Sequence, residues 1–295
     1  MAVAGWADSY QLNCKPVHFK YRLITIIFKR SNSAGLMANT NDQSGDVAGT
    51  RRPEAHQVDS ATISAFQNVV NSRRSTRIYD GEPVPDEVMH NCIDLALLSP
   101  NSSNLQPWQF YRVKSEAAKK ELVSYCLGQP AAATAPELVV CVSRLDTWDR
   151  NRQLMLDQLQ QVEGIPDSVL DYYNKIVPLA FKQGPLYLIG WLKKLVLNLL
   201  AIRKPMPRGP AGKADMRVWA HKSTALACQT LMLALRAHGY DSCPMEGMDP
   251  VRIRKMLKLP RGAEVCMVIS AGKRDSKGIY GPRIRFDRSL FVFEV

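Results

Sequence analysis

The sequence predicts an α+β domain. Helical and strand-like patterns alternate along the chain, and this alternation excludes an all-helical fold. The chain has 295 residues, of which 46% are hydrophobic and 22% charged, so it is long and apolar enough to bury a core. We therefore expect one compact domain with appendages rather than two domains.

The first 58 residues are expected to form a flexible polar leader. Residues 31–60 are rich in Ser, Asn, Asp, Gly and Thr and show no hydrophobic period. The apolar run at residues 23–28 is too short for the core of a signal peptide and follows a long polar lead. The folded domain, residues 59–295, should begin near Asp59.

Several segments carry helical patterns with recognisable ends. Asp59 or Ser60 can cap a first helix that runs to the arginines at residue 73, and Gly239 can end the longest one in a left-handed conformation. Pro250 fits the first turn of another helix. The expected helices are residues 60–72, 85–99, 117–126, 217–238 and 249–257.

Strands are predicted where β-branched and aromatic residues concentrate, at 109–113, 137–142 and 265–269. Residues 290–293, Leu-Phe-Val-Phe, also resemble a strand. Because they lie beyond a loop, we expect them to pair outside their own domain, with a dimer partner as the natural candidate.

The net charge of +12 is concentrated in two blocks, +9 over residues 175–222 and +7 over 251–295. Such blocks attract nucleotide phosphates, nucleic acid or acidic lipid, and the sign of the charge does not choose among them. No recognition-helix module and no basic strand interleaved with aromatics is evident, so nucleic-acid binding is not expected.

Seven scattered cysteines without a Cys-x-x-Cys pair favour a reducing compartment. The five histidines are isolated, so no metal site is predicted. No Ser/His/Asp or Cys/His arrangement is evident either, and no catalytic side chain is assigned.

Three motifs carry the functional prediction. The segment Arg73-Arg74-Ser75-Thr76-Arg77 supplies cations and a hydroxyl for a phosphate, although an ion-paired helix end would also explain it. Residues 99–108 form a polar loop, and residues 244–247 form a turn whose backbone can face a flat heterocycle.

In this order and at these separations, the motifs resemble the FMN-dependent nitroreductase family over residues 60–150 and 217–288. The resemblance implies a sandwich with a central, mostly antiparallel sheet flanked by helices. It also implies an interlocked homodimer with two FMN molecules at the interface, each held by both subunits.

The resemblance assigns the site residues by position, with Arg74 expected to point elsewhere. Pro100, Asn101, Ser102, Asn104 and Gln106 belong to the loop donated to the partner's flavin, where Asn101 replaces a common Ser. The other assigned residues are Arg73, Ser75, Arg77, Arg283 and Arg285 for the phosphate and ribityl tail, the backbone of Glu246 and Gly247 for the N5 edge, and Gln129 for the pyrimidine edge.

The implied reaction is ping-pong turnover. NADH or NADPH reduces FMN and leaves, and a nitroaromatic or quinone acceptor takes its place. Two alternatives remain: a dehalogenating relative within the same superfamily, and a flavin-binding sensor or membrane-associated interaction protein with little turnover. The sequence Gln106-Pro107-Trp108 is closer to the nitroreductase branch.

An insertion at about residues 150–216 departs from the compact family pattern. Residues 186–202 are apolar on most sides, but Lys193 and Lys194 disfavour a bilayer span. Residues 176–204 are expected either to cover the flavin pocket as a buried helix or to rest as a basic amphipathic helix on a membrane. The protein is accordingly expected in the cytoplasm, with peripheral contact to the inner face of the membrane under the second interpretation.

Overall fold

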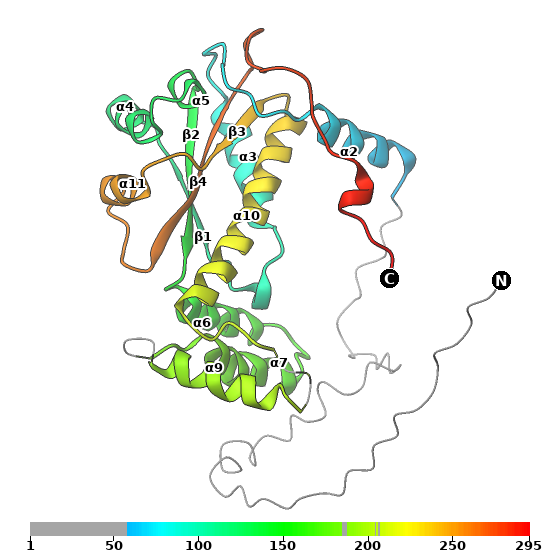
Figure 1. Cartoon of the computed structure of the whole chain (residues 1–295), viewed down its shortest axis with the longest axis vertical. Coiled ribbons are helices and arrows are strands. Elements are labelled where there is room, and N and C mark those ends of the chain that lie inside the picture. The colour runs from blue at the N-terminus through cyan, green and yellow to red at the C-terminus, as the bar shows by residue number, and fades with distance from the viewer. Residues whose placement is uncertain (1–57, 185–187, 204, 206) are drawn as a thin grey trace, which may run out of the picture. The chain divides into compact units, whose positions relative to one another are not determined.

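The computed structural model describes residues 58–184, 188–203, 205 and 207–295, all within the unit formed by residues 49–295. The leader predicted for residues 1–58 therefore lies, apart from Val58, outside the described residues. The described chain is an α+β structure, as predicted (Figure 1).

A four-stranded sheet forms its centre. All neighbouring strands are antiparallel, and their order is β1-β2-β4-β3. Seven of the eight residues of β2 are buried, as expected for an inner strand covered on both faces. The strands are β1 (Trp108–Arg112), β2 (Glu137–Arg144), β3 (Asp241–Met245) and β4 (Ala263–Gly272).

Helices cover both faces of the sheet (Figure 1). Side chains alternate along β2, so that Val139 and Cys141 pack with one set of helices and Leu138 and Val140 with the other. One face is covered by α3 (Asp86–Leu97) and α10 (Lys213–Ala237), the other by α4 (Glu116–Tyr125), α5 (Pro130–Ala133) and α11 (Pro250–Met256).

The predicted helix ends are confirmed. Asp59 caps α2 (Ser60–Ser72) by accepting a hydrogen bond of 2.7 Å from the amide of Thr62. Gly239, at φ +84°, follows the end of α10. The apolar side of α2 is not buried in its own chain, however, because Ile63 and Phe66 are 49% and 61% exposed.

The segment around the predicted insertion folds into a group of helices against the first half of α10. The rings of Phe181 and Trp219 lie 4.7 Å apart, edge to face, and the buried side chain of Leu105 joins the same cluster. The members are α6 (Trp148–Leu159), α7 (Asp167–Asp171), the π-helix η3 (Tyr172–Ile176), α8 (Val177–Phe181) and α9 (Leu188–Leu200). No helix in the described ranges is long and apolar enough to cross a bilayer.

The predicted strand at residues 290–293 does not form. The 3-10 helix η5 (Arg288–Leu290) stands there instead, with Asp287 accepting a hydrogen bond of 2.8 Å from the amide of Ser289. A strand needs a neighbouring edge to bond to, and residues 290–293 of the isolated chain pair with none. Pairing with another chain stays a prediction.

Candidate functional site

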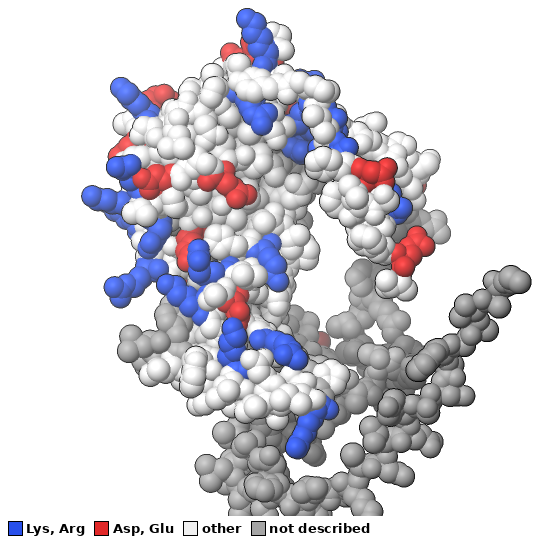
Figure 2. All heavy atoms as spheres, viewed as in Figure 1, with Lys and Arg blue, Asp and Glu red and all other residues white. Residues whose placement is uncertain are grey.

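Arginines from the two ends of the domain line one small pocket of about 190 Å³. The segment that follows α2 and the C-terminal segment meet beside β3. Backbone hydrogen bonds hold them there, from Thr76 to Ser242 at 3.2 Å and from Arg77 to Gly278 at 2.7 Å. Figure 2 shows the resulting group of basic side chains near α2. The pocket residues include Arg73, Arg74, Ser75, Arg77, Arg283 and Arg285.

The pocket is strongly positive because its lining contains no carboxylate. Burial lowers the pKa of Arg73, and repulsion from Arg283 and Arg285 lowers it further. A group of mutually repelling guanidiniums is stabilised by an anion, and their planar N–H donors match phosphate oxygens. The arrangement therefore fits a phosphate group.

Backbone contacts orient several of these arginines. Arg283 donates through Nη2 to the carbonyls of Asn71 and Arg73, at 2.8 and 2.6 Å, and so ties the C-terminal segment to the end of α2. Arg77 lies over the ring of Tyr280, 5.3 Å from its centroid. Arg74 was expected to point elsewhere, but it lines the pocket and donates to the carbonyl of Gly281 at 2.8 Å.

The structure brings Gln129 and Gly247 together at the other end of β3. Gln129 donates through Nε2 to the carbonyl of Gly247 at 2.6 Å and to that of Cys126 at 3.0 Å. A Cβ added at Gly247 would make only an ordinary contact, 3.4 Å, with the same Nε2 atom, so this approach does not itself require glycine. The amide of Met248 bonds to the carbonyl of Glu246 at 2.9 Å and closes the turn.

The arginine pocket and the contact between Gln129 and Gly247 lie at opposite ends of one strand, β3. The isolated bridge between Ser75 and Ser242 places the arginines at the start of β3, and Glu246 directly follows its end. At about 3.3 Å per residue, Glu246 lies roughly 13 Å along the chain from Ser242. An elongated ligand with an anion at one end and a flat polar ring at the other suits this spacing.

The polar loop lies elsewhere. The hydroxyl of Thr224 reaches the carbonyl of Pro107 at 3.3 Å, whereas Arg236, near the other end of α10, bonds to Ser72 at 2.9 Å. Twelve helical residues separate these two contacts, a rise of about 18 Å. The loop residues Pro100, Asn101, Ser102, Asn104 and Gln106 are therefore not brought to the arginine pocket of their own chain.

The loop is held in an unusual backbone conformation. Ser103, Asn104 and Gln106 have φ of 59°, 45° and 44°, which non-glycine residues seldom adopt. Asn101 accepts a hydrogen bond of 2.7 Å from the amide of Gln106, and Tyr173 donates to the carbonyl of Ser103 at 3.2 Å. Asn101 thus fixes the loop from within. Such conformations persist where surrounding contacts over-determine them, often at functional sites.

Comparison with known proteins decides the family. A family model described as "Nitroreductase family" matches residues 70–273, more than half of the chain. The chain belongs to the nitroreductase family. The confirmed α+β sandwich and the order of the three motifs agree with this membership.

Two relatives of this nitroreductase-family chain align with most of the domain. A "NADH dehydrogenase" of Thermus thermophilus is 26% identical over 218 residues, spanning 73% of this chain and 90% of the relative. A "Putative NAD(P)H nitroreductase MhqN" of Bacillus subtilis is 22% identical over 216 residues, spanning 73% and 91%.

Solved structures show the same fold. A putative nitroreductase ydfN of Bacillus subtilis has a TM-score of 0.63 at 20% identity, covering 79% of this chain and all of that one. A putative nitroreductase of Exiguobacterium sibiricum, solved in complex with FMN, has a TM-score of 0.59 at 23% identity, covering 78% and 97%.

This nitroreductase-family chain has a second, larger hollow of about 620 Å³. It lies around α4, α5 and the start of β2, with Lys119, Lys120 and Thr134 in its lining. It contains none of the predicted site residues, and Lys119 is paired with Glu116 at 3.3 Å. Size alone does not make it the site, because the convergent cations lie in the smaller pocket.

One contact in this nitroreductase-family structure was missed from the sequence. We saw no Cys/His arrangement, but the His221 ring lies against Cys266 and bonds to Glu264 at 3.1 Å. A β-bulge at Cys266 turns this residue toward α10, since Cys141 pairs with Met267 and Val142 with Val265. The neighbouring Cys228 thiol and burial raise the pKa of Cys266, so the sulfur is a neutral thiol rather than a nucleophile.

Proposed function

We propose that this protein is an FMN-dependent oxidoreductase that uses NADH or NADPH to reduce nitroaromatic or quinone-type acceptors by a ping-pong mechanism. The observation that carries the proposal is the carboxylate-free arginine pocket at the start of β3. Family membership and relatives named NADH dehydrogenase and NAD(P)H nitroreductase support both the reaction class and the reductant.

The residues present fit FMN. Arg73, Arg77 and Arg283 would hold the phosphate through charge-assisted hydrogen bonds, with Ser75 and Arg285 completing the pocket. The backbone of Glu246 and Gly247 and the amide of Gln129 would face the ring. When bound, FMN accepts hydride from the nicotinamide and passes electrons to the acceptor, so no side-chain nucleophile is needed.

The same residues would stabilise the charge that develops on the reduced ring. Amide groups fixed before the reaction need no reorganisation. Gln129 uses both Nε2 hydrogens on carbonyl acceptors, so its part would be to hold the turn whose backbone amides face the ring. The arginines neutralise the phosphate and keep the local potential positive. The residues of the chain would thus orient FMN and stabilise its reduced ring, while FMN itself carries out the hydride and electron transfer.

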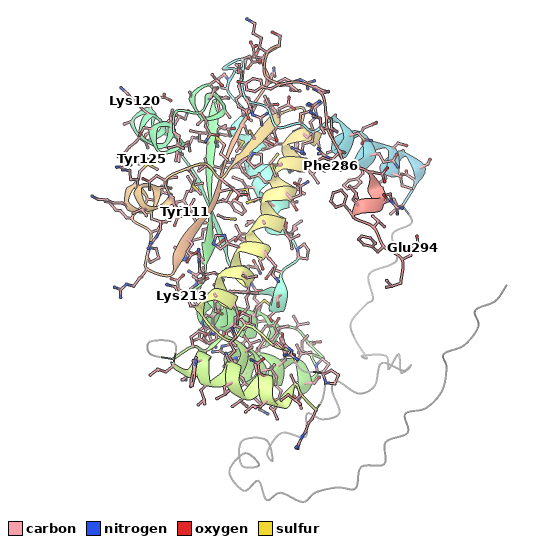
Figure 3. All side chains as sticks on the ribbon, viewed as in Figure 1. Tyr111, Lys120, Tyr125, Lys213, Phe286 and Glu294 are labelled. Atoms are coloured by element: carbon pink, nitrogen blue, oxygen red, sulfur yellow. The ribbon has the colours of Figure 1, made fainter. Side chains whose placement is uncertain are left out.

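The proposal includes a homodimer in which the loop at residues 99–108 serves the partner's flavin. Large apolar side chains remain exposed on α2 and on the C-terminal segment, including Phe66 at 61%, Phe286 at 74% and Phe293 at 75%. Figure 3 shows Phe286 on the segment that passes α2. A second copy would bury these surfaces, and would bring a polar loop to a pocket that its own loop does not reach.

The proposed compartment is the reducing cytoplasm. The six cysteines in the described residues are all free thiols, and five of them are buried. Unpaired cysteines are typical of proteins kept under reducing conditions.

The decisive experiment is to purify the full chain, record its visible spectrum, identify the chromophore released on denaturation, and add NADH or NADPH without air. We expect a flavin spectrum, FMN on release, and bleaching by a reduced nicotinamide. Initial rates with a nitroaromatic acceptor should give parallel double-reciprocal lines. A tightly flavinated protein that neither nucleotide bleaches would instead be a flavin-binding sensor, and protein that stays colourless with excess FMN would refute the site.

A further inference from the structure

The helix α9 presents an apolar stripe away from its own chain. Six large apolar side chains with helical spacing line one side of α9 and of the turn that follows it, over almost four turns. Each is about half exposed or more, which is rare for a contiguous set of large apolar side chains. They are Leu188 at 64%, Trp191 at 68%, Leu192 at 56%, Leu195 at 46%, Leu199 at 58% and Ile202 at 78%.

Contacts on the opposite side fix which way α9 faces. Gly190 is buried, and a Cβ there would lie 2.4 Å from the carbonyl oxygen of Ala211, so the helix backbone packs closely on the segment before α10. Figure 3 shows the neighbouring Lys213 at the first turn of α10. The outer stripe therefore cannot be the side that α9 uses to join its own domain.

Lys193 belongs to the inner side as well. Its ammonium donates to the carbonyls of Leu179, Ala180 and Lys182, at 3.3, 2.5 and 3.3 Å, and caps the end of α8. Burial lowers the pKa of this lysine. The sequence suggested that two lysines interrupt the apolar helix, but Lys193 leaves the outer stripe unbroken and only Lys194 is exposed.

The surroundings of the stripe are basic. From Val177 to Lys222 the sequence has nine lysines and arginines and one carboxylate, Asp215. That carboxylate accepts hydrogen bonds from the amides of Ala211 and Gly212, at 3.0 and 3.2 Å, and is used in capping α10. In Figure 2 the surface over α9 is largely uncharged and is bordered by Lys and Arg side chains. The exposed cations in the described part of this segment are Lys182, Lys194, Arg203, Arg208, Lys213, Arg217 and Lys222, of which Arg217 is paired with Glu264 at 2.7 Å.

We propose that the outer face of α9 docks on the surface of an anionic lipid bilayer. A Trp- and Leu-rich stripe flanked by Lys and Arg is the pattern of helices that lie in the membrane interface, where apolar side chains enter the acyl boundary and cations meet the headgroups. A second protein surface would need matching acidic groups, whereas an anionic membrane supplies them at any orientation.

The proposal has a consequence that rests on the proposed function. The helices α6 to α8 contact the polar loop through Tyr172 and Tyr173, and α9 is tied to them by Lys193. If this loop serves the flavin of a partner subunit, docking would bring the membrane near the catalytic centre. A lipid-soluble quinone would then be the acceptor class.

The test is co-sedimentation of the full flavinated chain with vesicles of phosphatidylcholine alone and with about one quarter phosphatidylglycerol. We expect at least roughly tenfold stronger partitioning to the anionic vesicles, weakened by salt. The double variant Trp191→Ser/Leu195→Ser should lose this binding. The matched control Val251→Ser, which removes an apolar side chain 72% exposed on α11, should retain it.

NADH oxidation with a water-soluble nitrobenzoate is measured in parallel and separates the two proposals. Normal turnover without vesicle binding would overturn the membrane proposal alone, and binding without turnover would overturn the enzymatic one alone. If Trp191→Ser/Leu195→Ser changes the assembly state or the flavin content in the absence of lipid, α9 covers another copy of this chain and the membrane proposal is wrong.

Discussion

Gln129 donates a hydrogen bond of 2.6 Å to the carbonyl oxygen of Gly247, although 118 residues separate them in the sequence. The contact joins the turn before α5 to the turn after β3. It therefore fixes the backbone that the proposed flavin ring would face. This pairing leads to a first prediction.

Replacing Gln129 with Ala should weaken FMN binding about fivefold, because the turn at Gly247 loses the hydrogen bond that holds it in place for the ring, and one such bond contributes about 1 kcal/mol. The dissociation constant can be measured by quenching of flavin fluorescence. Gln158→Ala, at an exposed position on α6, is the control and should bind FMN like the parent. Equal affinity of the two variants would show that Gln129 has no part in the site.

Replacing Arg285 with Met should change the stability of the protein against unfolding in opposite directions with and without FMN. Arg285 adds to the repulsion that lowers the pKa of Arg73, and its guanidinium donates a hydrogen bond to the carbonyl of the adjacent Ile284. Without FMN we expect the variant to be as stable as the parent or more stable, by up to about 0.5 kcal/mol after solvent screening. With FMN in excess it should be less stable than the parent, because the cofactor then binds more weakly.

Urea unfolding with and without FMN measures both effects. Arg261→Met, which removes an exposed arginine that does not line the pocket, is the control. A variant that is destabilised equally in both conditions would mean that Arg285 serves the fold and not an anion.

Replacing His221 with Gln should reduce the stability of the protein more at acidic than at alkaline pH. The contacts of His221 with Cys266 and Glu264 raise its pKa. A group whose pKa is higher in the folded state stabilises the fold below its unfolded pKa, near 6.5, and this contribution is lost as pH rises through the folded value. Urea unfolding at about pH 6 and about pH 8.5 should show the larger deficit at the lower pH. A deficit that does not depend on pH would exclude a charged His221.

Replacing Gly190 with Ala should destabilise the protein. Alanine gains up to about 1 kcal/mol in helix propensity, but its Cβ would lie 2.4 Å from the backbone oxygen of Ala211, and overpacking costs about 1 to 3 kcal/mol. We expect the clash to prevail. Gly212→Ala, at the N-cap of α10, is the control for an added Cβ without a clash, because a Cβ there meets no atom within 4 Å and only the capping preference is lost. Thermal unfolding of the two variants provides the comparison.

Local patterns predicted the helices well. The ends of α2, α4, α10 and α11 lie within a few residues of the expected positions, because caps, prolines and a left-handed glycine act on adjacent residues. Three of the four strands were also found from their β-branched and aromatic content, whereas β3 was not predicted. The antiparallel arrangement of the sheet came from the family resemblance, since strand order depends on contacts between distant segments.

The site was predicted in part. The structure joins Arg73, Ser75 and Arg77 to Arg283 and Arg285, as expected from their motifs. The position of Arg74 was wrong, because alternation along a short irregular segment does not determine where a long side chain points. The contact between His221 and Cys266 was missed, because the β-bulge that produces it shifts the register without a distinctive sequence signal. Residues 290–293 were assigned to a strand from composition, which does not supply a pairing edge.

The arginine pocket needs residues 73–77 and residues 279–285 at the same time. During synthesis, residues 73–77 leave the ribosome some two hundred residues before residues 279–285 do. If FMN binds in this pocket as proposed, it can bind only after residue 285 has been made, and a ribosome-stalled chain ending before residue 279 should bind no FMN. Truncation between residues 272 and 279 would then abolish activity even where the sheet and its helices still form.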